Sequence, residues 1–314
     1  MKKTMDVVIP VYRPGKEWEQ LLEGLARQNR KPDRILVINT GKEYWNSRWE
    51  KLLPGMEVVH IAPEAFDHGG TRDRAAQMSR ADFLVFMTQD AVPADERLLE
   101  ELEKAMEQSP DVRAAYARQL PRPDCRLEEQ YTRRFNYPAE SFIKRKEDLP
   151  RLGIKTYFCS NVCAIYDRET YRLLGGFPTR AIFNEDMIFA ARLIQNGYAV
   201  AYAANARVIH SHNYSALQQF HRNFDLAVSQ ADHPEVFSGI RSEGEGIRLV
   251  KSTAKFLAEE KKPWRIAGLC WNSGWKYLGY LLGKKYRRLP KSWVLRFTMN
   301  RRYWEKEENG RLLR

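Results

Sequence analysis

Short apolar runs alternate with amphipathic segments along roughly the first 120 residues. Apolar runs bounded by polar residues are typical of strands buried on both faces of a parallel sheet. The segments between them space their apolar side chains as one face of a helix does. The expected strands are residues 6–12, 34–39, 56–61, 83–87 and 112–117, and the expected helices are 18–28, 71–79 and 98–106. This alternation predicts an α/β fold with a mixed, mostly parallel, Rossmann-like sheet and flanking helices.

The middle of the chain is less regular. Residues 121–149 are rich in proline, charge and aromatic side chains. A long irregular segment of this kind forms either a lid or binding loop, or an inert surface insertion. The later patterns predict strands at 157–166, 198–203 and 206–209, and helices at 185–195 and 217–227.

The character of the chain changes beyond residue 230. Residues 239–246 have the pattern of a polar, glycine-containing linker. Residues 247–259, 264–282 and 293–304 predict helices rich in aromatic and basic side chains. We therefore expect a boundary near Ser238, with an α/β domain over 1–238 and a C-terminal helical region over 239–314.

The net charge of +12 falls entirely in the C-terminal region. Residues 241–314 hold 19 basic and 7 acidic side chains, whereas residues 1–240 hold 33 of each. This asymmetry indicates an anionic partner surface, either a membrane or a nucleic acid. Basic helices with interspersed aromatic residues favour the membrane, and the sequence has no RNA-recognition or helix-turn-helix pattern.

Other features of the sequence restrict the compartment. No stretch approaches the ~20 apolar residues of a spanning helix, and the N-terminus lacks the apolar region of a signal peptide. These features predict a cytoplasmic protein. Four scattered cysteines, Cys125, Cys159, Cys163 and Cys270, predict buried free thiols rather than a zinc site or a disulfide framework.

Asp90 is the first candidate for chemistry, because it follows the buried strand 83–87. Open α/β sheets bind ligands at the carboxyl ends of their strands. An Asp at this place can also simply cap the next helix. The sequence lacks GxGxxG after its first strand and lacks GxxxxGK[ST] throughout. It therefore does not fit a dinucleotide oxidoreductase or a P-loop NTPase.

Several motifs occur in the order typical of one enzyme family. They are VVIPVY at the first strand, FDHGGTRDRA, TQDAVP, GGF and NEDM, with a later HSHNYS and the tail KYLGYLLGKKYRRLP. Over nearly its whole length the chain resembles a family 2 glycosyltransferase of the GT-A type, and it is similar to bacterial rhamnosyltransferases. The resemblance implies transfer of a sugar from a nucleoside diphosphate.

The resemblance also implies a divalent cation, Mg²⁺ or Mn²⁺, that neutralises the departing diphosphate. Asp90 is the expected metal ligand, and His210 or His212 is expected to supply a second ligand or a diphosphate contact. Residues two apart on an extended segment point the same way. The chain departs from the family here, since Gln89-Asp90-Ala91 holds one carboxylate where two or three are usual.

Two segments are expected to bind the nucleotide sugar. The stretch from His68 to Asp73 places glycines and arginine at a helix N-terminus, which favours anions; the alternative is a tight turn into an ordinary helix. The nucleoside is expected at the ends of the first two strands. The donor-binding candidates are Pro10, Tyr12, Asn39, His68, Gly69, Gly70, Arg72, Asp73, Gln89 and Asp90.

Glu185 and Asp186 are the candidates for catalysis. Adjacent carboxylates repel, which can raise the pKa of one of them towards working pH. By resemblance Asp186 is the base of an inverting transfer, and Glu185 bonds the acceptor or donor. The alternative is that both residues only favour the start of a helix.

These expectations combine into one function. The chain is expected to move L-rhamnose from dTDP-L-rhamnose onto a hydroxyl of a lipid-linked saccharide or cell-surface polysaccharide, as a peripheral enzyme at the inner face of the cell membrane. The first alternative is another donor, a UDP- or GDP-sugar. The second is a non-enzymatic protein that binds nucleic acid through the basic tail.

Overall fold

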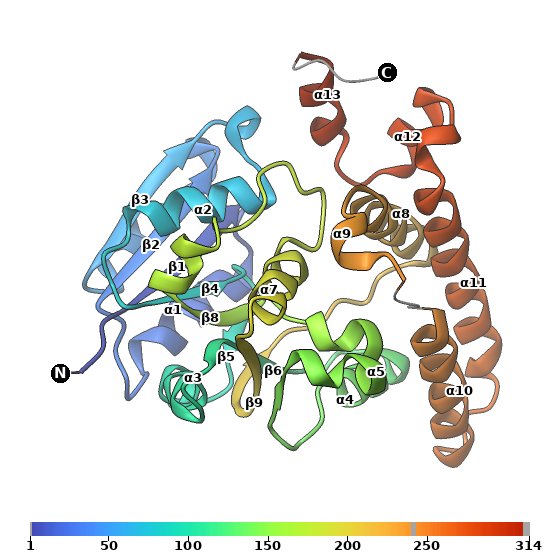
Figure 1. The fold of residues 1–314 in the computed structure, drawn as a ribbon, viewed down its shortest axis with the longest axis horizontal. Helices are drawn as coiled ribbons and strands as arrows, with labels where there is room; N and C mark the ends of the chain where they lie inside the picture. Colours follow the sequence, from blue (N-terminus) through green and yellow to red (C-terminus); the bar gives the residue numbers. More distant parts are fainter. Residues whose placement is uncertain (1, 240–242, 310–314) are drawn as a thin grey trace.

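The computed structural model describes residues 2–239 and 243–309, which form one mixed sheet covered by helices (Figure 1). The sheet order is β3-β2-β1-β4-β8-β6-β9-β5, and β7 pairs with β9. The strands are β1 (Met5–Tyr12), β2 (Arg34–Thr40), β3 (Met56–Ile61), β4 (Phe83–Met87), β5 (Val92–Pro93), β6 (Val112–Leu120), β7 (Phe142–Lys144), β8 (Cys163–Asp167) and β9 (Ala199–Ile209). The expected α/β class is confirmed, although four strand pairs are parallel and four are antiparallel.

The parallel strands β1 to β4 position the site. The chain leaves β1 towards β2 and β3, and later returns to place β4 on the other side of β1. The carboxyl ends of β1 and β4 therefore lie beside a reversal of strand order, where open sheets form a binding crevice. The residues directly after β4 are Thr88, Gln89 and Asp90.

Alternate residues of the strands face two separate cores, as the period of two requires. Val7 and Ile9 pack on the side of α1 (Lys16–Ala26) and α3 (Leu98–Glu107). Val8 faces the opposite side, where α2 (His68–Met78) and α7 (Glu185–Gln195) pack. Both faces are buried, which explains why the strands are continuous apolar runs.

Two strand predictions in the middle of the chain were wrong in extent. The run at 157–166 is strand only from Cys163, because Gly153–Tyr157 forms a 3₁₀ turn that leads into a loop. The two strands expected at 198–209 are one strand, β9, with an irregularity. Ala203 pairs with Ala117 whereas Arg207 pairs with Arg118, so the residues between them form a bulge.

The irregular segment at 121–149 is built into the fold. It contains α4 (Leu127–Asn136) and then β7, which pairs antiparallel with β9 at the edge of the sheet. Tyr131 of α4 stacks on Phe256 of α10 (Glu243–Glu259), with ring centroids 4.8 Å apart. The segment therefore connects the sheet to the C-terminal helices.

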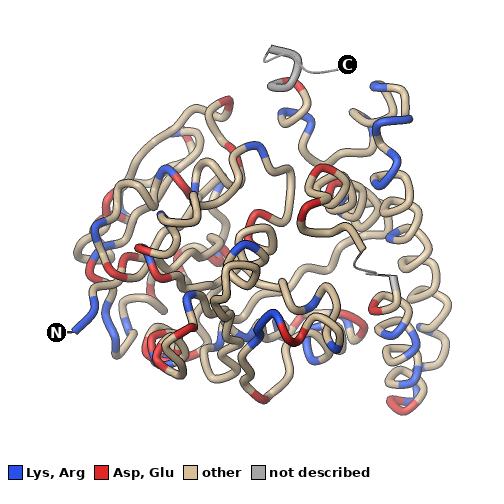
Figure 2. The backbone as a smooth tube through the Cα atoms, in the orientation of Figure 1, with Lys and Arg blue, Asp and Glu red and all other residues tan. Residues whose placement is uncertain are grey.

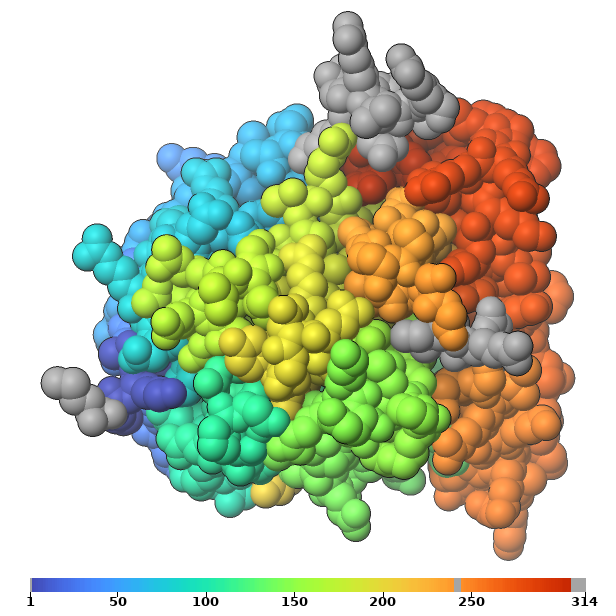
Figure 3. Space-filling view, viewed as in Figure 1, coloured from blue at the N-terminus to red at the C-terminus, as the bar shows by residue number. Residues whose placement is uncertain are grey.

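The C-terminal helices form one edge of the molecule, in orange and red in Figure 3. They are α10, α11 (Arg265–Lys284), α12 (Lys291–Phe297) and α13 (Arg301–Asn309), preceded by α8 (Ala216–Asp232) and α9 (Pro234–Phe237). The single helix expected at 293–304 is thus two, separated at Thr298. α10 begins inside the stretch expected as a linker, whose residues 240–242 lie outside the described residues.

Close contact between α8 and α11 depends on two glycines. A Cβ at Gly279 would lie 2.2 Å from the carbonyl oxygen of Phe220, and one at Gly283 would lie 2.3 Å from that of Phe224. A side chain at either position would therefore force the helices apart. Of the four cysteines, Cys270 on α11 is exposed, contrary to expectation, while the other three are buried and free.

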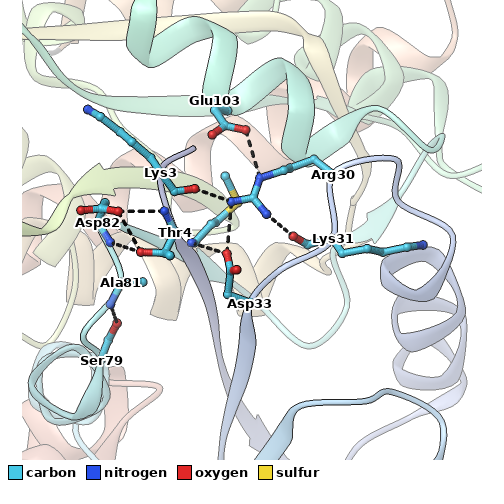
Figure 4. A network of polar contacts seen from close by, with 10 residues as sticks. Lys3, Thr4, Arg30, Lys31, Asp33, Ser79, Ala81, Asp82 and Glu103 are labelled. Carbon is cyan, nitrogen blue, oxygen red and sulfur yellow. Dashed lines mark hydrogen bonds and ion pairs between the residues drawn. The ribbon is translucent and has the colours of Figure 1, made fainter. Parts of the chain in front are cut away.

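A polar network ties the sheet together at the end opposite the site (Figure 4). Arg30 is buried and donates to Glu103 of α3 at 3.1 Å, to Asp33 at 3.1 Å and to the carbonyl of Lys3 at 2.7 Å. Charged hydrogen bonds of this kind are strong when they are shielded from water. The network fixes the amino ends of β1 and β2 against α3.

Candidate active site

A carboxylate and two imidazoles meet where β4 and β9 end. Asp90 Oδ2 lies 3.2 Å from His212 Nε2 and 3.5 Å from His210 Nε2. The two Nε2 atoms are 3.1 Å apart. All three groups offer a ligand atom within 4.8 Å of one another. The expectation that both histidines point the same way is confirmed.

Gln119 on β6 sets the protonation of His210. Its amide oxygen lies 3.0 Å from His210 Nδ1 and also accepts from the guanidinium of Arg133, while its amide nitrogen donates to Ser160 Oγ at 3.0 Å. Arg133 is only a donor, so the atom that it contacts is an acceptor. His210 Nδ1 therefore carries the proton, and Nε2 presents a lone pair towards Asp90, as in a metal-ligating histidine.

The electrostatics of the cluster suit a cation. Burial opposes ionisation of Asp90, but the neighbouring imidazoles of His210 and His212 outweigh it and hold the pKa of Asp90 well below its usual range. Burial lowers the pKa of His210, which favours its neutral form. One carboxylate and two imidazoles can hold a divalent metal ion, and this mixed set of nitrogen and oxygen ligands suits Mn²⁺ better than Mg²⁺, which prefers oxygen ligands only.

The acidic pair at the start of α7 is held by a buried ion pair and a backbone turn. Glu185 Oε1 lies 3.1 Å from Arg72 of α2, and both side chains are about one-tenth exposed or less. Asn184, just before the helix, has φ of 63°, in the left-handed region that is strained for most non-glycine residues. This backbone turn lies directly next to the two candidate catalytic carboxylates.

The two carboxylates of the pair have pKa values shifted in opposite directions. Asp186 accepts from the backbone N–H groups of Asn161 at 2.9 Å and Met187 at 2.8 Å. Even so, burial and the charge of Glu185 raise the pKa of Asp186 to about 7. Burial opposes ionisation of Glu185 too, but the charges of Arg72 and His68 outweigh it and lower the pKa of Glu185. One carboxylate thus stays ionised while its neighbour is poised to exchange a proton near neutral pH.

Asn161 is a site residue that the sequence interpretation missed. Its backbone binds Asp186, and its side-chain amide donates to Glu185 at 3.3 Å. The preceding residue, Ser160, binds Gln119 and so reaches the histidine cluster. The sequence feature that could have identified Asn161 is the polar pair Ser160-Asn161 inside an otherwise apolar run.

The start of α2 is less open to an anion than expected. Asp67 caps the helix, and its carboxylate accepts from the N–H of Gly70 at 2.6 Å. Gly69 is needed for packing, since a Cβ there would lie 2.1 Å from the carbonyl oxygen of Pro178. Asp73 turns away to Tyr171 at 3.0 Å and Gln77 at 2.8 Å.

The ends of β1 and β2 combine exposed and buried groups. Gln89 accepts from the backbone N–H of Tyr12 at 2.7 Å and donates to its carbonyl at 3.0 Å, which joins β1 to β4 at the site. Asn39 is fully buried, donates to the carbonyl of Gly41 at 3.0 Å and lies 3.0 Å from His60. Both contacts use its amide nitrogen, whereas its Oδ1 has no hydrogen-bond partner among the described residues.

A cleft of about 520 Å³ opens over these strand ends. Five of the predicted donor-binding residues line it, namely Pro10, Tyr12, His68, Arg72 and Gln89. Thr88 also lines it, two residues before Asp90, and Arg72 connects it to Glu185. Asp90, Glu185 and Asp186 do not line the cleft themselves: Asp90 directly follows the lining residue Gln89, and Glu185 is joined to the cleft through Arg72.

Known proteins resemble this chain over nearly its whole length. Residues 6–175 match the glycosyl transferase family 2 model. The chain is 39% identical over 308 residues to the O-antigen chain rhamnosyltransferase RfbN of Salmonella typhimurium, covering 97% of this chain and 96% of the relative. It is also 39% identical over 303 residues to the O-antigen chain rhamnosyltransferase WbaN of Salmonella anatum, covering 95% of each.

Solved structures share the fold. The mannosyltransferase PcManGT from Pyrobaculum calidifontis, in complex with GDP-Man and Mn²⁺, matches with a TM-score of 0.58 and 15% identity, over 98% of this chain and 85% of that one. S. aureus TarS 1-349 matches with a TM-score of 0.51 and 14% identity, over 91% of both chains. The chain is a glycosyltransferase and belongs to glycosyl transferase family 2.

Proposed function

We propose that the chain transfers L-rhamnose from dTDP-L-rhamnose, with inversion, to a hydroxyl of a growing O-antigen or related lipid-linked saccharide. The observation that carries the chemistry is the polarised pair at the start of α7. Glu185 is fixed by Arg72, which lines the cleft, and the adjacent Asp186 is a carboxylate with a raised pKa. The identity to two O-antigen chain rhamnosyltransferases supports the choice of sugar.

In the proposed reaction Asp186 is the base. The acceptor hydroxyl oxygen attacks the anomeric carbon of the sugar, its proton passes to Asp186, and the bond from that carbon to the diphosphate oxygen breaks. A base whose pKa lies near the working pH is well suited to this transfer. Glu185, held ionised by Arg72, keeps the neighbouring charge that raises the pKa of Asp186.

Asp90, His210 and His212 would hold the divalent metal ion, for which we propose Mn²⁺. When bound, it supplies positive charge to the departing diphosphate. Gln119 orients the ring of His210 for this role through the contact to Nδ1. Thermal shift with dTDP, with and without Mn²⁺ or Mg²⁺, tests this assignment. We expect dTDP to raise the melting temperature more in the presence of Mn²⁺ than in its absence. An increase that is the same with and without either metal ion would contradict the assignment.

A donor panel tests the sugar. Purified enzyme is incubated with dTDP-L-rhamnose, UDP-sugars and GDP-sugars, with a saccharide acceptor from membranes that lack this enzyme. We expect transfer from dTDP-L-rhamnose, with rates lower by about a hundredfold or more for the others, because a site built for one set of hydroxyls leaves polar groups unpaired with another. Preferred transfer from a UDP- or GDP-sugar would replace the proposed donor and keep the reaction class.

We also propose that the enzyme binds the inner membrane surface through α11. Among the described helices, none combines the length and apolarity needed to span a bilayer. Yet one face of α11 carries exposed apolar side chains at helical spacing, here called the α11 stripe. Its members are Trp264, Trp271, Leu278 and Leu281. Lys285 and Arg288 follow the end of this helix. Figure 2 shows this long helix as mostly uncharged between the basic segments of α10 and α12.

Vesicle flotation tests the membrane proposal. An apolar stripe with basic ends fits the interface of an anionic bilayer, where Trp is favoured. Replacing Trp264 and Trp271 together by Ser should lower binding to phosphatidylglycerol vesicles at least tenfold. The control is Leu173→Ser, which removes an exposed apolar side chain of α6 (Arg168–Leu173), outside the α11 stripe. Equal binding by the double variant and the control would reject the proposal.

A further inference from the structure

The far wall of the cleft comes from the C-terminal part of the chain. Its lining residues come from three segments. They are Arg180 of the loop before α7, Arg222 and Asp225 of α8, and Met299, Asn300, Arg302 and Tyr303 near the C-terminus. All of these residues follow residue 175, the last residue that matches the family model. This wall is therefore an addition to the part of the fold that the match covers.

The wall is anchored firmly to α8. Asp225 accepts from the backbone N–H of Met299 at 2.8 Å, and His221 Nδ1 lies 2.6 Å from the carbonyl oxygen of Phe297. A small core buries the segment on both sides of this anchor, formed by Ile182, Phe224, Val228, Val294 and Trp304. In Figure 1, α12 and α13 lie above α8, at the top of the view.

The cationic groups on the opposite wall are already neutralised. Arg72 is paired with Glu185 at 3.1 Å, and the carboxylate of Asp67 occupies the N-terminus of α2. By contrast, none of Arg180, Arg222 and Arg302 forms an ion pair with a carboxylate within the described ranges. The guanidinium of Arg222 instead lies over the rings of Phe183 and Tyr214, at 4.6 and 5.7 Å from their centroids.

A buried acceptor adds a second sign of a missing ligand. Asp225 is about 3% exposed and lines the cleft. Its Oδ2 accepts from Met299, but its Oδ1 has no hydrogen-bond partner among the described residues. Buried polar atoms without partners are uncommon in proteins, and this acceptor requires a donor, which a hydroxyl group of a nucleotide sugar can provide and its diphosphate cannot.

We propose that the segment from Thr298 to Tyr303 completes the donor site, and that Arg180, Arg222 and Arg302 bind the diphosphate of the nucleotide sugar. The inference rests on the proposed function, because it assumes a nucleoside diphosphate donor. Guanidinium groups bind phosphate oxygens through paired hydrogen bonds, and three of them more than offset the two negative charges on the diphosphate of a nucleotide sugar. The C-terminal segment would then contribute to the affinity for the nucleotide sugar as well as to the stability of the fold.

Calorimetric titration with dTDP and with inorganic diphosphate, in constant Mn²⁺, tests the proposal. Arg302→Ala should weaken both ligands about tenfold to a hundredfold, the range for a hydrogen bond to a charged group. Arg302→Lys, which keeps a point charge but not the planar fork, should recover part of this loss. The matched control is Arg301→Ala, an exposed neighbour that does not line the cleft and should bind as the wild type does.

The outcomes separate this inference from the proposed function. If the wild type binds dTDP and Arg302→Ala binds it equally well, the diphosphate role is overturned while the proposed transfer stands. If the wild type binds neither dTDP nor diphosphate, both fail. Arg222→Ala is a second variant, with thermal melting as the check on folding. Because Arg302 is exposed, its variant alone keeps the test decisive if Arg222→Ala does not fold.

Discussion

Arg72 on α2 and Glu185 on α7 form a buried ion pair with 3.1 Å between nitrogen and oxygen. The pair joins two elements that are more than 100 residues apart in the sequence. It holds the first carboxylate of the catalytic pair ionised and thereby sets the charge next to Asp186. This single contact links the structure of the cleft to its chemistry.

Replacing Arg72 by Met should destabilise the protein by about 3–5 kcal/mol, because it leaves the buried charge of Glu185 without a partner. Urea denaturation measures the loss. The double variant Arg72→Met, Glu185→Gln should recover much of it. Lys104→Met is the control, since Lys104 forms exposed pairs with Glu100 at 2.6 Å and Glu101 at 3.0 Å, and solvent-screened pairs of this kind contribute little to stability. Equal losses in Arg72→Met and Lys104→Met would contradict the assigned role.

The rate should depend on pH through Asp186. A base must be deprotonated to act, so kcat should fall as the pH drops through the raised pKa of Asp186, near 7. Glu185→Gln removes the neighbouring negative charge, which favours the ionised form of Asp186 and lowers its pKa. The acidic limb of the kcat profile should therefore move to lower pH in this variant. An unmoved limb would show that another group controls the profile.

Removal of the strand-end carboxylate should abolish the metal dependence of donor binding. Asp90→Ala leaves two imidazoles without the oxygen ligand, so Mn²⁺ should no longer increase the affinity for dTDP. The readout is the ratio of dTDP affinities with Mn²⁺ and after treatment with EDTA. Asp95→Ala is the control, because Asp95 is paired with Arg207 outside the cluster. A ratio that stays at its wild-type value in Asp90→Ala would argue against the metal site.

The glycines of α11 should tolerate substitution very unequally. Gly283→Ala places a Cβ against the carbonyl oxygen of Phe224 and should lower stability by about 1–3 kcal/mol through overpacking. Gly274→Ala lies on the same helix with nothing within 4 Å, so it should be neutral or stabilising by up to about 1 kcal/mol. Thermal melting compares them. Similar melting temperatures would mean that α8 and α11 are not tightly packed.

The sequence was most informative about the strands near the site. The apolar run before Asp90 predicted a buried strand, and the acidic pair was placed at the start of an amphipathic helix. Both predictions were possible because an apolar run and helical periodicity are local features of the sequence. The extent of β8 was mispredicted, since a 3₁₀ turn and a buried loop are also apolar. β9 was divided in two because its bulge resembles a break.

The contacts between distant segments could not be predicted in this way. The anchoring of Met299 by Asp225 spans 74 residues and leaves no periodic signal. The role of Gln119, which orients His210 across 91 residues, is equally invisible in the sequence. Such contacts depend on how the C-terminal helices and the sheet meet, and tertiary packing alone determines this.

The most direct test of the account is Asp186→Asn, assayed with labelled dTDP-L-rhamnose and membrane-bound acceptor in parallel with dTDP titration. The amide keeps the size of the side chain but cannot take a proton, and its single oxygen can accept from only one of the N–H groups of Asn161 and Met187, so thermal melting accompanies the assay as a check on folding. We predict that transfer falls by a factor of 10² to 10⁴ while dTDP affinity stays within about threefold of the wild type. Transfer at the wild-type rate would contradict the assignment of Asp186 as the base.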